Sequence, residues 1–334
     1  MGAFRPRVLA LAVKIEATSG TDSVPTLAAN AVSLMNVPKL TLAYLEPGTR
    51  DDIVSGLLGT VDRAVPAGRH VTLDLKLEVK GFGAAYSAVN LPEVDALLRC
   101  SGLSHTVVVT GGTESVAYTT IDDAMETATI YAWTAHKLFK LVGCVAKPKL
   151  TGTALKIGTM DFSVVGKMVT DAVDVTPFVA PTLNQTVPPL FHSGAAQIGA
   201  GWTTASAEPL IIKTAELDFG NTVSERSSAG ATDGIIGWIV TDRKMALKMA
   251  VEQVTLATFD PYTASRQNSV ISNLPVQFQW GSAQYNRLKV FTGRWALKAP
   301  GDAAVNNLSG WDLNGELVQT TEATSGREIR LLYD

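Results

Sequence analysis

Val71-Thr-Leu-Asp-Leu-Lys-Leu-Glu-Val79 alternates apolar and polar residues without a fault over nine positions. Successive side chains of a β-strand point to opposite faces, so one face of this stretch is aliphatic. The other face carries Thr72, Asp74, Lys76 and Glu78. This period of two predicts a half-buried antiparallel strand, with a core on one side and a polar surface on the other.

Further strand-like segments surround this stretch. The sequence predicts strands near residues 8–13, 40–44, 107–109, 127–131, 137–142 and 159–164. A single helix is expected over residues 92–102, where the apolar residues share one face. Asn90 is placed to cap the start of this helix, and Gly102 is placed to end it.

A long connection separates the strand at 40–44 from the alternating stretch. It runs from Glu46 to Arg69 and contains several glycines and prolines. Irregular connections longer than about 12–15 residues are uncommon in compact domains and usually have a function. We therefore expect this segment to serve one.

The composition is that of a β-rich chain with little charge. Charged residues occupy 18% of the 334 positions, below the roughly 25% of an average globular protein, and 46% are apolar. The formal net charge of −3 argues against a protein that grips nucleic-acid phosphates, which needs a basic excess. Cys100 and Cys144 are too few for a disulfide framework and are expected to be buried apolar residues.

The first residues do not have the pattern of a targeting segment. Their apolar run spans six residues before Lys14, which is too short for the core of a signal peptide. No stretch reaches the ~18 apolar residues that a membrane helix needs. The sequence therefore predicts a chain made in the cytoplasm, with no membrane partner.

Four segments of the first half recur in the same order in the second half. Residues 39–51 match 213–225, 73–79 match 245–251, 138–143 match 288–293, and 157–164 match 308–315. A preserved order of matches indicates an internal repeat. The prediction is a mainly β chain with two tandem β domains, residues 1–172 and 210–334, the first with a flanking helix. Residues 173–209, rich in proline and glycine, would connect them.

No group of residues points to catalysis. The four histidines, His70, His105, His136 and His192, are isolated, and phosphate-loop and hydrolase motifs are missing. Thr241-Asp242-Arg243 fits a salt bridge or a strand end better than a catalytic acid. We predict no catalytic residue, no bound cofactor and no metal.

Residues throughout the chain resemble a known family. The opening strand, the ribbon Glu16-Ala-Thr-Ser-Gly-Thr-Asp-Ser-Val-Pro25, Asn30 between two alanines and the strand starting at Lys39 are similar to the start of tail tube (major tail) proteins of long-tailed, siphovirus-type bacteriophages. The helix ending at Gly102, residues 114–118 and the strand pair at 137–147 and 160–166 continue the likeness. In the second half it is carried by Asn221, Arg226, Gly234, Ile235, Thr241, Asp242 and Arg243.

This resemblance implies tail-tube-like β-sandwich or barrel domains, in chains that form rings. The rings stack into a hollow virion tail tube through which DNA passes. Such a structural protein has no catalytic residues, and its partners are other copies of itself and the tape measure, tail tip and tail terminator proteins. If a ring needs six domains, two domains per chain imply a trimer with pseudo-sixfold symmetry.

Three sets of residues then become candidate contacts. The polar strand faces form a candidate lumen face: Asp74, Lys76, Glu78, Asp161, Asp312 and Glu316. The long connection is a candidate ring-stacking loop: Pro47, Gly48, Arg50, Asp51, Asp52, Leu57 and Leu58. The polar, nearly uncharged ribbon is a candidate contact with the next ring, where burying charges is costly: Thr18, Thr21, Asp22 and Pro25.

Other interpretations stay open at this point. One is a hexamer in which only the first half builds the tube and the second half decorates its outside. A different class is an enzyme on a β scaffold, such as a hydrolase. A β-rich adhesin or fibre subunit is a further alternative, but it normally carries a secretion signal.

Overall fold

The alternating stretch forms the strand that it predicts. It lies in β3 (Val65–Glu78), where the four aliphatic side chains from Val71 to Leu77 are at most 2% exposed. Asp74, between them, is exposed. One face of the strand is therefore buried and the other is open, as a period of two requires.

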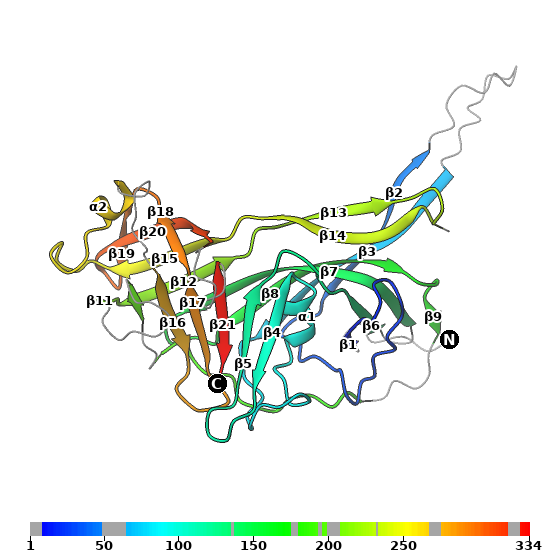
Figure 1. The fold of residues 1–334 in the computed structure, drawn as a ribbon, viewed down its shortest axis with the longest axis horizontal. Helices are drawn as coiled ribbons and strands as arrows, with labels where there is room; N and C mark the ends of the chain where they lie inside the picture. Colours follow the sequence, from blue (N-terminus) through cyan, green and yellow to red (C-terminus); the bar gives the residue numbers. More distant parts are fainter. Residues whose placement is uncertain are drawn as a thin grey trace, which may run out of the picture.

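The computed structural model describes residues 9–48, 65–134, 137–174, 180–192, 196–198, 208–231, 233–266, 275–319 and 328–334. It confirms a mainly β fold built from antiparallel strands (Figure 1). The described helices are short: α1 (Asp95–Arg99) and α2 (Pro261–Arg266).

The strands up to residue 174 are β1 (Leu9–Ile15), β2 (Lys39–Gly48), β3, β4 (Leu103–Val108), β5 (Ser115–Thr120), β6 (Ala128–Thr134), β7 (Lys137–Thr153), β8 (Thr159–Met168) and β9 (Val173–Asp174). The strands after it are β10 (Gln197–Ile198), β11 (Glu208–Pro209), β12 (Ile212–Asp218), β13 (Asn221–Ser227), β14 (Ile235–Arg243), β15 (Ala246–Glu252), β16 (Val276–Trp280), β17 (Leu288–Thr292), β18 (Arg294–Leu297), β19 (Gly301–Val305), β20 (Leu308–Val318) and β21 (Ile329–Tyr333).

One large antiparallel sheet runs through both halves of the chain. Its main path follows the order β18-β20-β15-β12-β7-β8-β3-β2. β19 pairs with β20, next to β18, and β6 and β9 pair with the first part of β7. Because β7 pairs directly with β12, the sheet continues without a break from the first half into the second.

A second sheet of seven strands also takes strands from both halves, in the order β11-β10-β16-β17-β21-β5-β4. The last strand, β21, lies between β17 and the β4–β5 hairpin, below the large sheet in Figure 1. Side chains from the two sheets form one large buried cluster, which includes Trp280, Trp295 and Trp311. Strands from the two halves therefore share a core.

The β13–β14 hairpin forms a separate two-stranded sheet that packs on the first half. It lies above β7 in Figure 1. Its residues Ile235, Trp238 and Val240 make a small core with Val145, and the rings of Trp238 and His70 are 5.7 Å apart. A hairpin from the second half is thus held by residues of the first.

The predicted helix over 92–102 is wrong in its extent. It shortens to α1, and the residue before it is Val94, which makes no side-chain cap. The Asn90 N–H instead donates to the Ser87 hydroxyl, in the turn that leads to the helix. Gly102 does end the segment, with a φ of +85° that favours glycine.

The irregular connection expected between Glu46 and Arg69 is also shorter than predicted. β2 continues to Gly48 and β3 already begins at Val65, and the two strands pair as a long hairpin. After Tyr44 the register shifts, and the pairing continues to Gly48 opposite Val65. Prolines and glycines interrupt the alternation here, which is why the sequence pattern missed these strand ends.

Residues 180–192 of the connecting segment lie against the first half. The Thr182 N–H donates to the Leu27 carbonyl, and the Lys80 ammonium donates to the Asn184 carbonyl at 2.8 Å. Later in the same expected segment, β10 pairs with β16. Part of the connection therefore belongs to the second sheet.

Candidate assembly surfaces

The strand pair β7–β12, which we call the junction, joins the two halves edge to edge. Its antiparallel register runs from Thr214 opposite Thr153 to Asp218 opposite Lys149. The Lys149 ammonium lies 2.9 Å from the Glu216 carboxylate, and this hydrogen bond raises the pKa of Lys149. A backbone ladder and an ion pair thus connect the halves.

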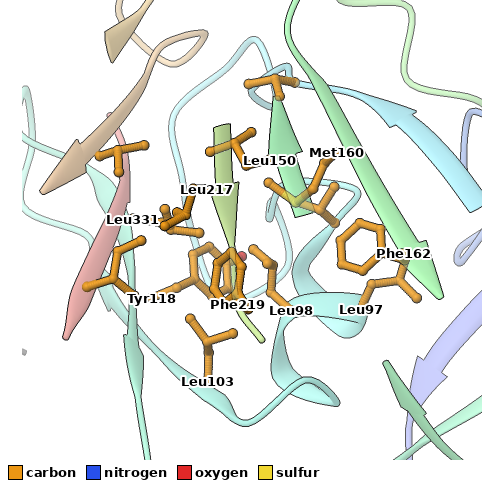
Figure 2. Close-up of a cluster of buried hydrophobic side chains, with 14 of the residues drawn as sticks. Leu97, Leu98, Leu103, Tyr118, Leu150, Met160, Phe162, Leu217, Phe219 and Leu331 are labelled. Carbon is orange, nitrogen blue, oxygen red and sulfur yellow. The ribbon is translucent and has the colours of Figure 1, made fainter. Parts of the chain in front are cut away.

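Phe219 fills the core side of the junction. Its side chain is 0% exposed, and its N–H donates to the Pro148 carbonyl. Figure 2 shows the ring in one cluster with Leu98, Leu103 and Tyr118 of the first half. The first strand of the second half therefore places an aromatic side chain in the core of the first half.

The order of elements is the same on both sides of the junction. From the outer edge inward, the first half contributes β2-β3-β8-β7; from the junction outward, the second contributes β12-β15-β20-β18. In chain order, α1 follows β3, and α2 follows β15. Each of these strands has a counterpart at the same place in the other half.

The pairing registers align the counterpart strands. If residues 157–164, which include the start of β8, are matched with residues 308–315 of β20, the β3–β8 and β15–β20 registers align Leu73 with Leu247. Both leucines are buried. The sequence comparison had matched Leu73 with Met245, which is displaced by two residues but lies on the same face.

Alignment by the pairing registers also changes the match between β2 and β12. The β2–β3 and β12–β15 registers align Leu42 with Phe219 and Leu40 with Leu217. The sequence match of residues 39–51 is therefore displaced by three positions. Because side chains alternate between the two faces of a strand, an odd displacement aligns residues that point to opposite faces. Similarity between short strand sequences does not reveal such an error, whereas the pairing registers do.

Both ends of the main path of the large sheet are unpaired on their outer side within the described part of the chain. β2 pairs with β3 alone, and β18 and β19 pair with β20 alone. An open strand edge presents N–H and C=O groups that can accept another strand. Since β2 is the counterpart of β12, and β18–β19 of β7, the free edges correspond to the two sides of the junction.

The predicted lumen-face residues lie on one face of the large sheet. Cross-strand neighbours in a sheet point to the same side, and one such row reads Lys76, Asp161, Lys149, Asp218, Ala246 and Glu316. Asp74 and Glu78 alternate with the buried leucines of β3, and Asp312 alternates with the buried residues of β20. The structure thus places Asp74, Lys76, Glu78, Asp161, Asp312 and Glu316 on this face, which we call the polar face.

Carboxylates of the polar face pair with lysines of the same face. The N–O distances are 3.8 Å for Lys76–Asp161, 2.9 Å for Lys149–Glu216, 3.4 Å for Lys248–Asp312 and 3.2 Å for Lys298–Glu316. Such exposed pairs add about 0–1 kcal/mol each to stability. Their larger effect is electrostatic, because each lysine has a negative neighbour that reduces its attraction for an external anion.

One end of the polar face is covered by the β13–β14 hairpin. The Lys167 ammonium donates to the Ile235 carbonyl at 3.2 Å and lies 3.3 Å from Asp233. Val165, on the same side of β8, packs against the hairpin core. The four lysine–carboxylate pairs of the polar face remain half-exposed.

The candidate ring-stacking loop is described only at its start. Pro47 and Gly48 belong to the end of β2. Arg50, Asp51, Asp52, Leu57 and Leu58 lie outside the described residues.

The N-terminal ribbon is anchored by a buried carboxylate that the sequence analysis did not identify. Glu16 is 6% exposed and accepts hydrogen bonds from the hydroxyls of Thr127 and Thr129 and from the N–H groups of Gly20 and Gly143. These bonds span 2.6–2.9 Å. A charged residue after an apolar strand gives no sequence signal of burial, because three of its four partners, Thr127, Thr129 and Gly143, lie over 100 residues away.

The candidate contact residues of the ribbon differ in exposure. Thr18 and Thr21 are exposed. Asp22 accepts a hydrogen bond from the Tyr131 hydroxyl, and Pro25 is buried within the chain. Residues 17–21 and Val24 therefore offer the accessible part of the ribbon, and their contact with another ring stays a prediction.

We expect Glu16→Gln to lower the free energy of unfolding by about 1–3 kcal/mol, because the new amide NH₂ faces hydrogen-bond donors. Denaturant unfolding measures this loss, and Thr18→Ala on the exposed ribbon serves as a control without effect. An unchanged stability of Glu16→Gln contradicts the buried role of the carboxylate.

Titratable groups elsewhere have structural partners. Asp95 accepts a hydrogen bond from the Tyr118 hydroxyl and lies 2.6 Å from His105 Nδ1. Arg243 forms ion pairs with Glu328 and Asp122, and the Asp242 carboxylate lies 3.9 Å from the Lys244 ammonium. These partners differ from the Asp242–Arg243 salt bridge that the sequence suggested. Among the described residues, no group of three His, Cys, Asp or Glu could hold a metal ion.

The two cysteines are buried, as predicted. Burial raises the pKa of the Cys100 thiol to about 12, and it also raises the pKa of Cys144. Both thiols therefore stay protonated and unreactive at neutral pH.

Comparison with known proteins adds no family assignment. No protein-family model matches the chain, and no curated protein sequence matches it. Over the described residues, none of the helices has the length and apolar character needed to cross a membrane.

Proposed function

We propose that this protein is the subunit of a bacteriophage tail tube, a structural virion protein whose chains close into rings that stack around a DNA channel. The observation that carries the proposal is the junction. One chain already joins two sets of strands edge to edge, in the same order, and leaves the counterpart edges free. The resemblance in sequence points to the same function.

The free edges are suited to a head-to-tail contact. All neighbours along the main path are antiparallel, so β2 and β18 at its two ends run in opposite directions, as β12 and β7 do. An edge-to-edge contact between different surfaces generates a ring if the rotation closes. Closure pairs the two free ends of the main path and removes a site of uncontrolled aggregation.

A trimer is the stoichiometry that we propose. Each chain supplies two sets of four strands to the main path, so three chains give the six sets of a pseudo-sixfold ring. In the competing hexamer, the second half decorates the outside of a tube built by the first half. Continuation of the same sheet through the second half favours the trimer.

The polar face is then the lining of the channel. Its paired charges and hydroxyls hold water while offering few unpaired cations to phosphate groups. DNA passes along such a surface without sequence-specific binding. The partners in the virion would be further copies of the chain and the tape measure, tail tip and tail terminator proteins.

Electron microscopy of the purified protein at high concentration tests the proposal. We expect regular tubes with a central channel and three chains per ring in projection images. A ring of six chains instead supports the decorated hexamer. A monodisperse monomer under all conditions contradicts the proposed function.

A further inference from the structure

We infer that β2 of one chain docks on β18–β19 of a second copy in one defined register, with Leu42 taking the place that Phe219 occupies within the chain. This inference rests on the proposed function for the existence of a ring. It adds the residues that make the contact between chains.

The pairing registers make Leu42 the counterpart of Phe219. Leu40 and Leu217, two positions earlier, both pack on the large core. Leu42 and Phe219 therefore point to the same side of their strands. Phe219 is 0% exposed, whereas Leu42 is 44% exposed. The difference is that β12 has a neighbour on its outer side and β2 has none among the described residues.

The register of the second contact follows from the register of the junction. Asp218 stands opposite Lys149 in the junction. Thr41 is the counterpart of Asp218 in the alignment that pairs Leu42 with Phe219. Lys149 stands opposite Asp161 of β8, and Gly301 stands opposite Asp312 of β20. Because Asp161 and Asp312 are matched when β8 is aligned with β20, Gly301 is the counterpart of Lys149. Thr41 of one chain is thus expected opposite Gly301 of the next, and Leu40 opposite Asp302.

The receiving edge can accept a strand in this register. Gly301 is exposed, and a Cβ added there meets no atom closer than 3.7 Å. Thr41 is exposed as well. Both positions therefore tolerate a cysteine side chain without displacing neighbours.

A cysteine pair tests the register. Directly opposite residues of antiparallel strands have Cα atoms about 4.5–5.5 Å apart, within the range that a disulfide bridges. The probe is the full chain carrying Thr41→Cys and Gly301→Cys, assembled and then oxidised by a mild disulfide reagent. Loss of two thiol hydrogens forms one S–S bond per contact, and the reagent is reduced. The buried native cysteines do not compete.

Each chain of the double variant carries one introduced cysteine on β2 and one on β19, so every contact in a closed ring can form a disulfide. We expect a ladder on a non-reducing gel that ends at the covalent trimer. The matched control combines Thr41→Cys with Ala304→Cys, whose expected partner is Pro38 rather than Thr41. It should give little cross-linking, because the two sulfurs lie about 10 Å apart along the strand.

A second measurement tests the side chain. Leu42→Asp is expected to raise the concentration needed for assembly by about tenfold or more, since a buried leucine is replaced by a charge. The unfolding midpoint of the unassembled chain should stay unchanged, because Leu42 is half-exposed there. Val109→Asp is the control. Val109 is 65% exposed and directly follows β4, a strand of the other sheet, so this variant should assemble normally.

The outcomes separate this inference from the proposed function. Tubes that form without the Thr41–Gly301 cross-link, or that tolerate Leu42→Asp, overturn the inference and leave the tube intact. Dimers from Thr41→Cys alone show β2 pairing with itself and overturn the inference too. If no variant and no wild-type preparation forms rings, both proposals fail.

Discussion

A Phe219→Ala chain is expected to lose about 3–5 kcal/mol of unfolding free energy relative to wild type. Phe219 is fully buried, and its neighbours in the cluster of Figure 2 come from α1, β4 and β5 of the first half. Removal of the phenyl ring leaves a cavity under the junction. The surrounding helix and strands can fill this cavity only in part, because their backbones are held in place by their own packing and hydrogen bonds. The loss therefore falls at the contact between the two halves.

Denaturant unfolding followed by tryptophan fluorescence measures this effect. Trp280, Trp295 and Trp311 are all buried in the shared core, so they report on the second half and on the junction together. We expect one transition, moved to lower denaturant, because both sheets cross from one half to the other. Phe219→Leu keeps most of the apolar volume and should cost less than Phe219→Ala.

Phe162→Ala is the matched control for the junction. Phe162 is 1% exposed and lies in β8, inside the first half. It should cost a similar amount and also unfold in one transition. A loss below about 1 kcal/mol for Phe219→Ala, with a normal loss for Phe162→Ala, contradicts the packed junction on which the assembly proposal depends.

The polar face was predictable because its signal is local. Alternation in β3 assigns Asp74, Lys76 and Glu78 to one side of a strand without knowledge of the neighbours. The same rule placed Asp161 and Asp312 on like faces of their own strands. That these strands share one sheet depends on pairing between distant residues, which the alternation does not encode.

Phe219 and Glu16 could not be predicted in the same way. Phe219 follows the last residue of β12, at a strand end where an aromatic residue indicates neither burial nor exposure. Its burial depends on α1 and the β4–β5 hairpin, about 100 residues earlier. Glu16 is buried because Thr127, Thr129 and Gly143 supply donors from β6 and β7 and from the residue before β6. Partners of this kind are specified by the tertiary fold alone.

Neutralising three carboxylates of the polar face is expected to turn it into a DNA-binding surface. In the combined variant Asp161→Asn, Asp312→Asn, Glu316→Gln, the lysines at 76, 248 and 298 lose their negative partners. The three substitutions preserve side-chain size, and the lost exposed pairs cost little stability. The freed ammonium groups can then contact phosphates along the duplex.

Fluorescence anisotropy with a short labelled DNA duplex measures this gain on the unassembled chain, where the polar face is accessible. We expect at least about tenfold tighter binding than wild type at low salt, with log K falling against log salt at about −0.9 per phosphate contacted. The control variant is Asp123→Asn, Asp174→Asn, Glu225→Gln. It changes the net charge by the same amount, at exposed positions that do not belong to the four lysine–carboxylate pairs of the polar face. If the control binds DNA as tightly as the polar-face variant, net charge alone is responsible. The paired lysines then have no special part in keeping DNA from adhering, and the case for the polar face as a channel lining loses its electrostatic basis.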